Sequence, residues 1–241
     1  MSGLTIVMLA PFGIRPKGTL AARMLPLAQA LVRRGHRVSI VAPPVQNPED
    51  AGRREVLGGV TVTHTRLPRL PGMAGAPGLA AALLREALLA RPQVLHLFKP
   101  KGYGGLAALL ARVLRPGLPL VVDTDDWEGR GGWNDLLPYP YPARLLFSWQ
   151  ERDLPRRAAA VTVASRTLET QVWGFGVPRE RVFYLPNGVT MADSGRRQSS
   201  NLPSSIFTLL LYTRFWEFDV RDVVAALAGI AAGCERAQLV V

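Results

Sequence analysis

The sequence has few of the residues that form covalent crosslinks and metal sites. It contains a single cysteine, Cys234, which excludes an internal disulfide and fits the reducing cytoplasm, where we expect the protein to work. Its three histidines, His36, His64 and His96, show no metal-ligand spacing. We therefore expect structural roles for the cysteine and for most histidines, and neither a bound metal nor another cofactor.

Long apolar runs and several familiar catalytic motifs are also missing. No stretch reaches the roughly eighteen apolar residues that a membrane span requires. The chain starts directly on an apolar run of strand length, without a basic leader, so we expect no signal peptide. There is neither a G-x-S-x-G elbow nor a P-loop, which argues against a serine hydrolase and a P-loop kinase.

Charge is strongly one-sided. The formal net charge is +11, and nearly all of the 29 basic residues are arginines. Such a surplus attracts polyanions, namely nucleic acid, an anionic membrane surface or phosphorylated substrates. The arginines are scattered in pairs such as Arg156 and Arg157, without the dense runs and interleaved aromatics of nucleic-acid binders. We expect no nucleic-acid partner, while peripheral contact with an anionic membrane surface stays open.

The first 42 residues have the pattern of a parallel βαβ unit. An apolar run over residues 4–10 is followed by a loop with two glycines and two prolines. Helical spacing of apolar residues over 20–34 and a second apolar run over 37–42 complete the unit. A connection of this kind forces parallel pairing with a right-handed crossover.

The same alternation continues to about residue 190 and predicts a doubly wound, mainly parallel α/β sheet. Further strands are expected at residues 60–64, 94–98, 118–122, 160–164 and 181–185, and helices at 79–90, 106–114, 144–157 and after Ser165, whose side chain suits an N-cap. Residues 45–59 are expected to be loop, 68–77 a proline- and glycine-rich linker, and 133–142 too irregular for an element.

A second unit is expected after a polar stretch. Residues 1–192 form the predicted first domain, and residues 193–205 have the composition of an interdomain linker. The alternation then restarts over 206–241, with a strand at 207–212, a helix at 220–232 and a strand at 238–241. One βαβ unit buries too little surface to form a whole domain, so we expect the chain to be cut short there.

The most polar strand end belongs to the fifth apolar run. Residues 118–122 lead into Asp123, Asp125 and Asp126, followed by Trp127 and a glycine-rich loop. Ligands of open α/β sheets bind beyond the carboxyl ends of the strands, so these acids are candidates for chemistry. Two alternatives remain: a solvated turn, and an Asp-x-Asp metal site over 123–125, since carboxylates suit Mg²⁺ or Mn²⁺.

Four stretches together resemble a known family. They are PKGT at 16–19 before a helix ending RGHRV at 34–38, the strand ending DTDD at 123–126, AVTVAS at 160–165, and LPNGV at 185–189. In order and spacing they resemble the N-terminal half of a GT-B glycosyltransferase of family four. The resemblance implies two Rossmann-like domains facing a cleft, with the acceptor on the first and a nucleotide-sugar donor on the second.

The resemblance implies where the donor would bind. Gly18 and Thr19 match a Gly-Gly pair whose backbone amides approach the donor phosphate, although Thr19 departs from the pattern. Asn187 and Arg214 match donor contacts on the hinge side, but no lysine follows Arg214 as the family pattern requires. If successive strand ends converge, Thr19, Asp125 and Asn187 should meet at one edge of the sheet.

The remaining candidates concern the acceptor. Asp125 stands where many family members have a histidine, and with Asp126 it would orient or deprotonate the acceptor hydroxyl. His96, Lys99 and Trp127 are the expected acceptor contacts. The resemblance implies a retaining, metal-independent transferase that takes a nucleotide-diphosphate sugar as co-substrate and a glycan, lipid or small molecule as acceptor. We expect this chain alone to be inactive; the alternative is a non-catalytic glycan- or lipid-binding remnant.

Overall fold

The structure is a computed structural model that describes residues 3–15, 20–70, 72–188, 207–210, 219–233 and 237–240. Contacts divide the chain into two units, Met1–Thr190 and Met191–Val241. The first unit contains most of the described residues and every described residue of the candidate site.

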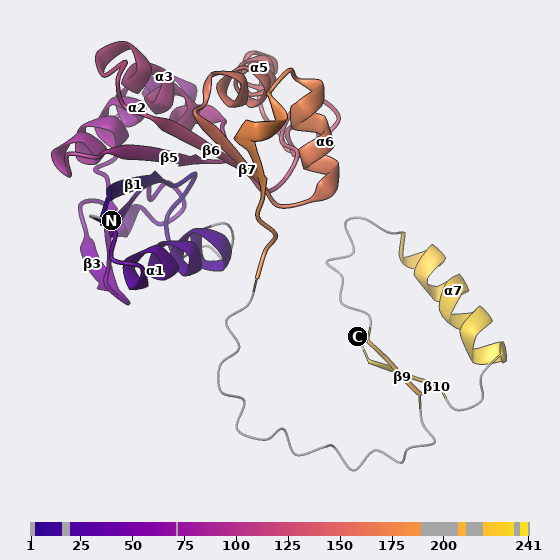
Figure 1. Cartoon of the computed structure of the whole chain (residues 1–241). Helices are drawn as coiled ribbons and strands as arrows, with labels where there is room; N and C mark the ends of the chain where they lie inside the picture. The colour runs from indigo at the N-terminus through magenta and orange to yellow at the C-terminus, as the bar shows by residue number, and fades with distance from the viewer. Residues whose placement is uncertain are drawn as a thin grey trace. The chain divides into compact units, whose positions relative to one another are not determined.

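The first unit is organised around an eight-stranded sheet with the order β3-β4-β2-β1-β5-β6-β7-β8 (Figure 1). Its strands are β1 Thr5–Leu9, β2 Arg37–Ala42, β3 Arg54–Leu57, β4 Val60–His64, β5 Val94–Phe98, β6 Leu120–Thr124, β7 Ala160–Val163 and β8 Val182–Tyr184. Every pairing is parallel except that of β3 with β4. The predicted doubly wound, mainly parallel α/β class is confirmed.

Helices cover both faces of this sheet. They are α1 Leu25–Arg33, which continues a π-helical turn at Leu20–Met24, then α2 Gly72–Leu89, α3 Gly102–Leu114, α4 Trp133–Leu136, α5 Tyr141–Arg157 and α6 Arg166–Gly174. In Figure 1, α1 lies on one side of the sheet, and α2, α3 and α5 lie on the other. Two buried clusters correspond to these two sides, with Met24 and Ala28 in one and Leu83 and Leu154 in the other.

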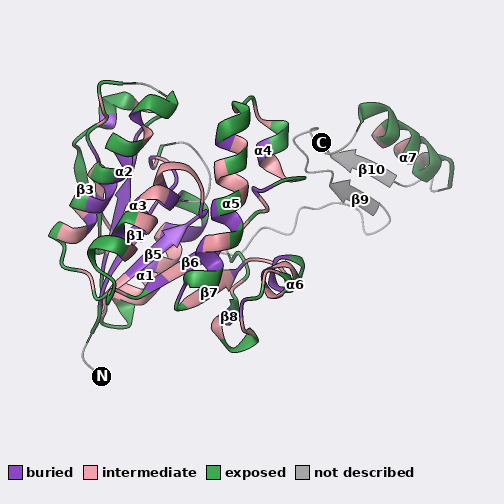
Figure 2. Cartoon of the chain, turned by 90° about the horizontal axis from the view of Figure 1, so that it is seen from above, coloured by how far each residue is buried: buried purple, intermediate pink, exposed green. Residues whose placement is uncertain are grey.

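The first strand shows why its apolar run is continuous. Ile6 and Met8 belong to the cluster that contains the residues of α1, whereas Val7 and Leu9 belong to the opposite cluster. Successive side chains of a strand point to opposite faces, so a strand covered on both faces needs apolar residues throughout. The buried strands at the centre of Figure 2 show the result.

The prediction of a loop over 45–59 is wrong for its second half. Strand β3 pairs antiparallel with β4 and is joined to it by Gly58 and Gly59 alone. Both glycines have positive φ, 58° and 82°, as a two-residue hairpin turn requires. The polar sequence of β3 hid the strand because it lies at the edge of the sheet and is only partly buried.

Two segments predicted to be irregular are helical. Helix α2 begins at Gly72 and includes Pro77, and within it Gly75 packs so close to Leu70 that a side chain would collide. The proline and glycine content of 68–77 therefore serves close packing as well as a turn. Residues 133–142 contain α4 and the start of α5, where Pro142 occupies the first turn, a position that tolerates proline.

The second unit contains β9 Phe207–Leu210, α7 Val220–Gly233 and β10 Ala237–Val240. The two strands pair in parallel, in register from Phe207 with Ala237. The strand, helix and strand expected here are all present. The expected linker at 193–205 lies outside the described residues.

Candidate functional site

The candidate site lies where the strand order reverses. From β1 the chain adds β2 on one side, and later β5 on the other. The loops that follow β1 and β5 therefore diverge, and such a switch point opens a crevice at the carboxyl edge of the sheet. His96 lies within β5, and Lys99 follows this strand directly.

Lys99 is the centre of a buried charge cluster. Its Nζ lies 3.1 Å from Oδ1 of Asp125, 2.8 Å from Oδ2 of Asp126 and 2.9 Å from Oε1 of Glu128. The side chains of Lys99, Asp125 and Glu128 are less than a tenth exposed, whereas that of Asp126 is 50% exposed. We call residues 125–132 the acid loop, and Lys99 ties it to the end of β5.

These contacts decide what Lys99 can do. Burial alone would lower the pKa of Lys99, but Asp125, Glu128 and Asp126 together raise that pKa above its ordinary value. The ammonium is therefore charged, and an ammonium has three protons to donate. Three carboxylates surround this ammonium, so Lys99 holds the acid loop. Its expected role as an acceptor contact stays a prediction.

A second lysine extends the cluster. Lys101 pairs with Glu128 through a very short contact and donates to Oδ1 of Asn134 over 3.1 Å. Lys99 and Lys101 are two of only three lysines in the chain. Glu151 of α5 interacts electrostatically with this cluster. Its side chain is buried, with the residue 1% exposed, and both of its carboxyl oxygens lack a hydrogen-bond partner among the described residues.

The environment of Glu151 keeps it protonated. Burial is the largest cause that raises its pKa, and Glu128 and Asp125 add to it, while Lys101 and Lys99 act against them. The result is a pKa of about 8. At neutral pH Glu151 is therefore mostly a neutral acid within this cluster.

Arg23 joins three distant parts of the first unit. Its Nε donates to Oδ1 of Asp123 over 2.7 Å and its Nη2 to Oδ2 over 2.8 Å, with both residues buried. Its Nη1 donates to Oδ1 of Asn187 over 2.9 Å, and Thr162 makes a further short hydrogen bond to Asp123. Asn187 is thus held at the same edge of the sheet as the acids.

Sequence reasoning missed Arg23, although a signal was present. It lies in the first turn after the glycine loop, between the buried Leu20 and Met24. A charged residue that is buried needs a partner of opposite charge, so an arginine within an apolar stripe points to a carboxylate elsewhere. Lys101, Glu128 and Glu151 were missed as well, because nothing local to them indicates burial.

His96 is held neutral. It is 7% exposed, its ring lies 4.3 Å from that of Phe98, and its Nε2 has no hydrogen-bond partner within the described part of the chain. Burial and then the positive charge of Arg23 lower its pKa to about 3. A neutral imidazole at the switch point can accept or donate a hydrogen bond but carries no charge.

Trp127 shapes the acid loop from within. Its Nε1 donates to the carbonyl of Arg130 over 2.9 Å, and its ring lies 5.6 Å from that of Phe175. Gly129 and Gly132 approach the indole so closely that a Cβ at either position would collide with Trp127. The glycines of this loop therefore let the backbone fold around one indole ring.

Of the three residues expected to meet at one edge, the described ones are Asp125 and Asn187. Both lie at the carboxyl edge of the sheet. Arg23 bonds to Asn187 and to Asp123 of β6, and Asp125 follows this strand directly in the chain. Gly18, Thr19 and Arg214 lie outside the described residues.

The Asp-x-Asp alternative finds other partners for its two carboxylates. Asp123 is bonded to Arg23, and Asp125 lies against Lys99. Across the residues that the structure describes, no group of three or more His, Cys, Asp or Glu side chains could hold a metal ion. The donors that the motif would offer to a cation are thus already directed at basic side chains.

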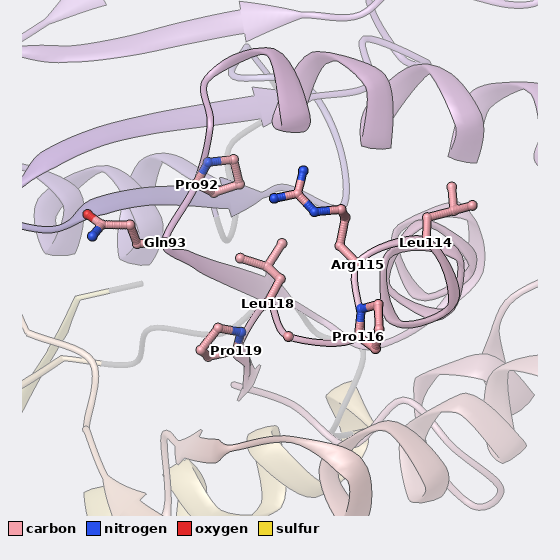
Figure 3. A pocket seen from close by; sticks show the side chains of 8 residues that line it. Pro92, Gln93, Leu114, Arg115, Pro116, Leu118 and Pro119 are labelled. Atoms are coloured by element: carbon pink, nitrogen blue, oxygen red, sulfur yellow. The ribbon is translucent and has the colours of Figure 1, made fainter.

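A hollow of about 470 Å³ lies far from these groups. It is formed by the segments just before β5 and β6, with Pro92, Gln93, Arg115 and Leu118 among its lining residues (Figure 3). These segments precede their strands, so the hollow lies at the amino edge of the sheet, opposite the acid loop. It contains none of the expected site residues.

None of the described helices is long and apolar enough to cross a membrane.

The fold and this edge define a class. A mainly parallel sheet with a strand-order reversal beside a charged carboxyl edge is a Rossmann-like domain, the kind of domain from which GT-B enzymes are built. The sequence matches the family described as "Glycosyl transferase 4-like domain" over residues 18–188. The chain belongs to this glycosyltransferase family, as the resemblance of its motifs predicted.

Solved structures share the fold. A glycosyltransferase from Rickettsia africae is 10% identical, with a TM-score of 0.57 over 100% of this chain and 68% of its own. HepE from Anabaena, in complex with UDP and glucose, is 14% identical, with a TM-score of 0.59 over 98% of this chain and 60% of its own.

The same fold occurs in another class of nucleotide-sugar enzyme. UDP-GlcNAc 2-epimerase from Neisseria meningitidis, bound to UDP-GlcNAc, is 11% identical, with a TM-score of 0.60 over 98% of this chain and 64% of its own. This chain thus spans about two thirds or less of the length of these three proteins. No curated protein matches the sequence significantly.

Proposed function

We propose that the protein transfers a sugar from a nucleotide-diphosphate sugar to a glycan, lipid or small-molecule acceptor, with retention of configuration and without a metal ion. The observation that carries the proposal is the acid loop, held by Lys99 at the switch point of a domain whose family is glycosyltransferase. The fold alone, shared with epimerases, would leave the reaction open, and the family match supports transfer.

The two acids of the loop take different roles in this proposal. Asp126 is half exposed, so one of its oxygens can accept a hydrogen bond from an acceptor hydroxyl while the other stays on Lys99. Asp125 is almost buried and fixes the loop through its ion pair with Lys99. A carboxylate near the acceptor hydroxyl favours its attack, because it stabilises the positive charge that develops as the proton leaves.

The donor contacts are proposed from the family pattern. Gly18 and Thr19 would offer backbone amides to the diphosphate, and Arg214 would offset its charge in place of a metal ion. Asn187, already fixed by Arg23 at this edge, would contact the donor from the hinge side. The UDP bound to HepE and the UDP-GlcNAc bound to the epimerase support a nucleotide sugar as the substrate class.

The environment of the reaction is also a proposal. We place the protein in the cytoplasm, and its net charge of +11 supports contact with anionic partners such as a membrane surface.

The test is transfer by an active enzyme that contains this chain. A panel of UDP-, GDP- and ADP-sugars is offered with glycan, lipid and small-molecule acceptors, and release of the nucleoside diphosphate is measured. We expect acceptor-dependent release, and we expect Asp125→Asn and Asp126→Asn each to lower kcat by more than about tenfold. Epimerisation of the sugar nucleotide without transfer would overturn the proposal.

A matched variant separates the site from a general loss of charge. Asp222→Asn makes the same chemical change on an exposed position of α7. It should retain the rate of the unmodified enzyme. If Asp125→Asn and Asp126→Asn also retain it, the acid loop does not belong to the reacting site.

A further inference from the structure

A second hollow borders the acid loop at Trp127 and Arg130, and the roles proposed above do not use it. It has a volume of about 440 Å³ and lies between the acid loop and the exposed face of α5. Three arginines and two tryptophans dominate its lining, together with one acid: Arg130, Arg152, Arg156, Trp127, Trp149 and Asp153. We call this set the arginine hollow.

The arginine hollow carries uncompensated positive charge. Oδ2 of Asp153 lies 2.5 Å from Nε of Arg157, so the single acid of the lining already has a cationic partner outside it. Arg130, Arg152 and Arg156 form no ion pair with any residue that the structure describes. All three are exposed. An anion that enters the hollow therefore meets three guanidinium groups that form no ion pair with a described carboxylate.

The walls of the hollow are fixed by aromatic packing. Phe175 lies between the two sides, with its ring 5.6 Å from that of Trp127 and 5.8 Å from the guanidinium carbon of Arg152. The carbonyl of Arg130 accepts the hydrogen bond of the Trp127 indole, which fixes the backbone of that arginine. These contacts fix the backbone of Arg130 on the side of the acid loop and position the guanidinium of Arg152 on the side of α5.

One face of helix α5 forms the other wall of the hollow. Trp149, Arg152 and Arg156 are spaced by three and four residues, and such residues lie side by side on a helix. Trp149 remains 47% exposed despite its size. An exposed indole beside guanidinium groups offers a flat apolar surface next to hydrogen-bond donors for an anion.

We propose that the arginine hollow binds the phosphate group of the acceptor. Guanidinium groups bind phosphate through paired N–H donors, and the indole rings of Trp127 and Trp149 would contact the adjoining ring or apolar stem. Trp127, which lines the hollow, directly follows Asp126 in the sequence, so the hollow borders the acid loop that the proposed reaction uses. This inference rests on the proposed function and restricts its acceptor to phosphorylated molecules.

Binding is tested on the full chain without any sugar transfer. Glycerol 3-phosphate, glucose 6-phosphate and inorganic phosphate are titrated while tryptophan fluorescence and heat are recorded, with glycerol and glucose as uncharged controls. We expect binding of the phosphates only. The variant Arg130→Gln/Arg156→Gln removes the charge-assisted hydrogen bonds of two arginines, so it should bind these phosphates about tenfold more weakly or worse.

A second experiment, with lipid vesicles, distinguishes a lipid-borne phosphate from a free one. Sedimentation with phosphatidylcholine vesicles is compared with and without added phosphatidylglycerol. Binding to the anionic vesicles that is lost in Arg130→Gln/Arg156→Gln supports a lipid-borne phosphate, and binding of the soluble esters alone supports a free one.

The control is Arg33→Gln/Arg34→Gln, which removes the same charge from two exposed arginines at the end of α1. Equal weakening in this control would show general attraction to a basic protein and would overturn the proposal. Absence of binding in both arms would overturn it as well. If this chain binds phosphate while a longer protein that contains it transfers no sugar to any acceptor, the result contradicts the proposed function and leaves the anion site intact.

Discussion

Arg23 and Asp123 are 100 residues apart in the sequence and form a two-pronged ion pair in the buried interior of the first unit. Arg23 belongs to the turn that precedes α1, and Asp123 belongs to β6. Through the same guanidinium, Asn187 is attached to the end of the sheet. The pair thus fixes the carboxyl edge on which the acid loop depends.

Removing one partner of this pair should be costly. In Arg23→Met the carboxylate of Asp123 stays buried without its cation, and we expect the free energy of unfolding to fall by about 3–5 kcal/mol. Urea unfolding followed by tryptophan fluorescence measures the loss.

The matched control is the surface pair of Arg157 with Asp153, in which the arginine side chain is 51% exposed. Arg157→Met should cost less than about 1 kcal/mol, because solvent screens an exposed pair. Similar losses in the two variants would show that burial does not govern the energy of the Arg23 pair.

Lys99→Met should loosen the acid loop. The variant leaves Asp125, Asp126 and Glu128 close together without the ammonium that they share, so their mutual repulsion is no longer offset. We expect the backbone amides of the loop to exchange hydrogen about tenfold faster or more, as local opening becomes easier.

Lys101→Met provides the comparison two residues away. Lys101 contacts Glu128 and Asn134 but neither aspartate, so its loss should have a smaller effect on exchange at residues 125 and 126. Hydrogen exchange read by mass spectrometry distinguishes the two variants. Unchanged exchange in Lys99→Met would remove Lys99 from its holding role.

Glu151 should make stability depend on pH. Its pKa is about 8 in the folded protein against 4.5 as its ordinary value, mainly because of burial. Between these values the folded state holds a proton that the unfolded state releases. Stability therefore falls as pH rises, by up to about 1.4 kcal/mol per pH unit, and levels off above the folded pKa.

His96 acts in the opposite direction at lower pH. Its pKa falls from 6.5 to about 3 on folding, so its contribution is present above pH 6.5 and is lost as the pH falls toward 3. The window from pH 6.5 to 8 thus isolates Glu151 from His96. In this window Glu151→Gln should flatten the dependence of the unfolding free energy on pH. The control Glu180→Gln, at an exposed position, should leave that dependence unchanged. A steep slope in Glu151→Gln would show that another group causes it.

Gly105→Ala should disturb the packing of α3 against α5. A Cβ at Gly105 would lie 2.7 Å from the side-chain amide of Gln150, which is fully buried and donates to the carbonyl of Gly102. We expect a loss of about 1–3 kcal/mol from overpacking, measured by thermal unfolding.

Gly174→Ala tests the same substitution in open space. No atom lies within 4 Å of a Cβ at Gly174, so this variant should gain up to about 1 kcal/mol from helix propensity. Adding Gln150→Ala to Gly105→Ala should recover part of the loss. If the double variant loses as much stability as Gly105→Ala and Gln150→Ala lose together as single variants, the collision with Gln150 is not the cause.

Local chemistry was sufficient for most elements. Continuous apolar runs gave the positions of the central strands, and Ser165 caps α6 as predicted, with its Oγ accepting from the amide of Leu168 over 3.2 Å. The prediction failed at the edge strand β3 and at the starts of α2, α3 and α5, which are rich in glycine or proline.

The sequence by itself determined the alternation of strands and helices, the parallel class of the sheet and the acids at the end of β6, because spacing and polarity are local properties of the chain. Only the tertiary structure decided the partners of those acids. Lys99 and Arg23 reach them because the strand order places β1, β5 and β6 side by side. Ion pairing depends on distance in space, and a crossover connection sets that distance independently of the local sequence.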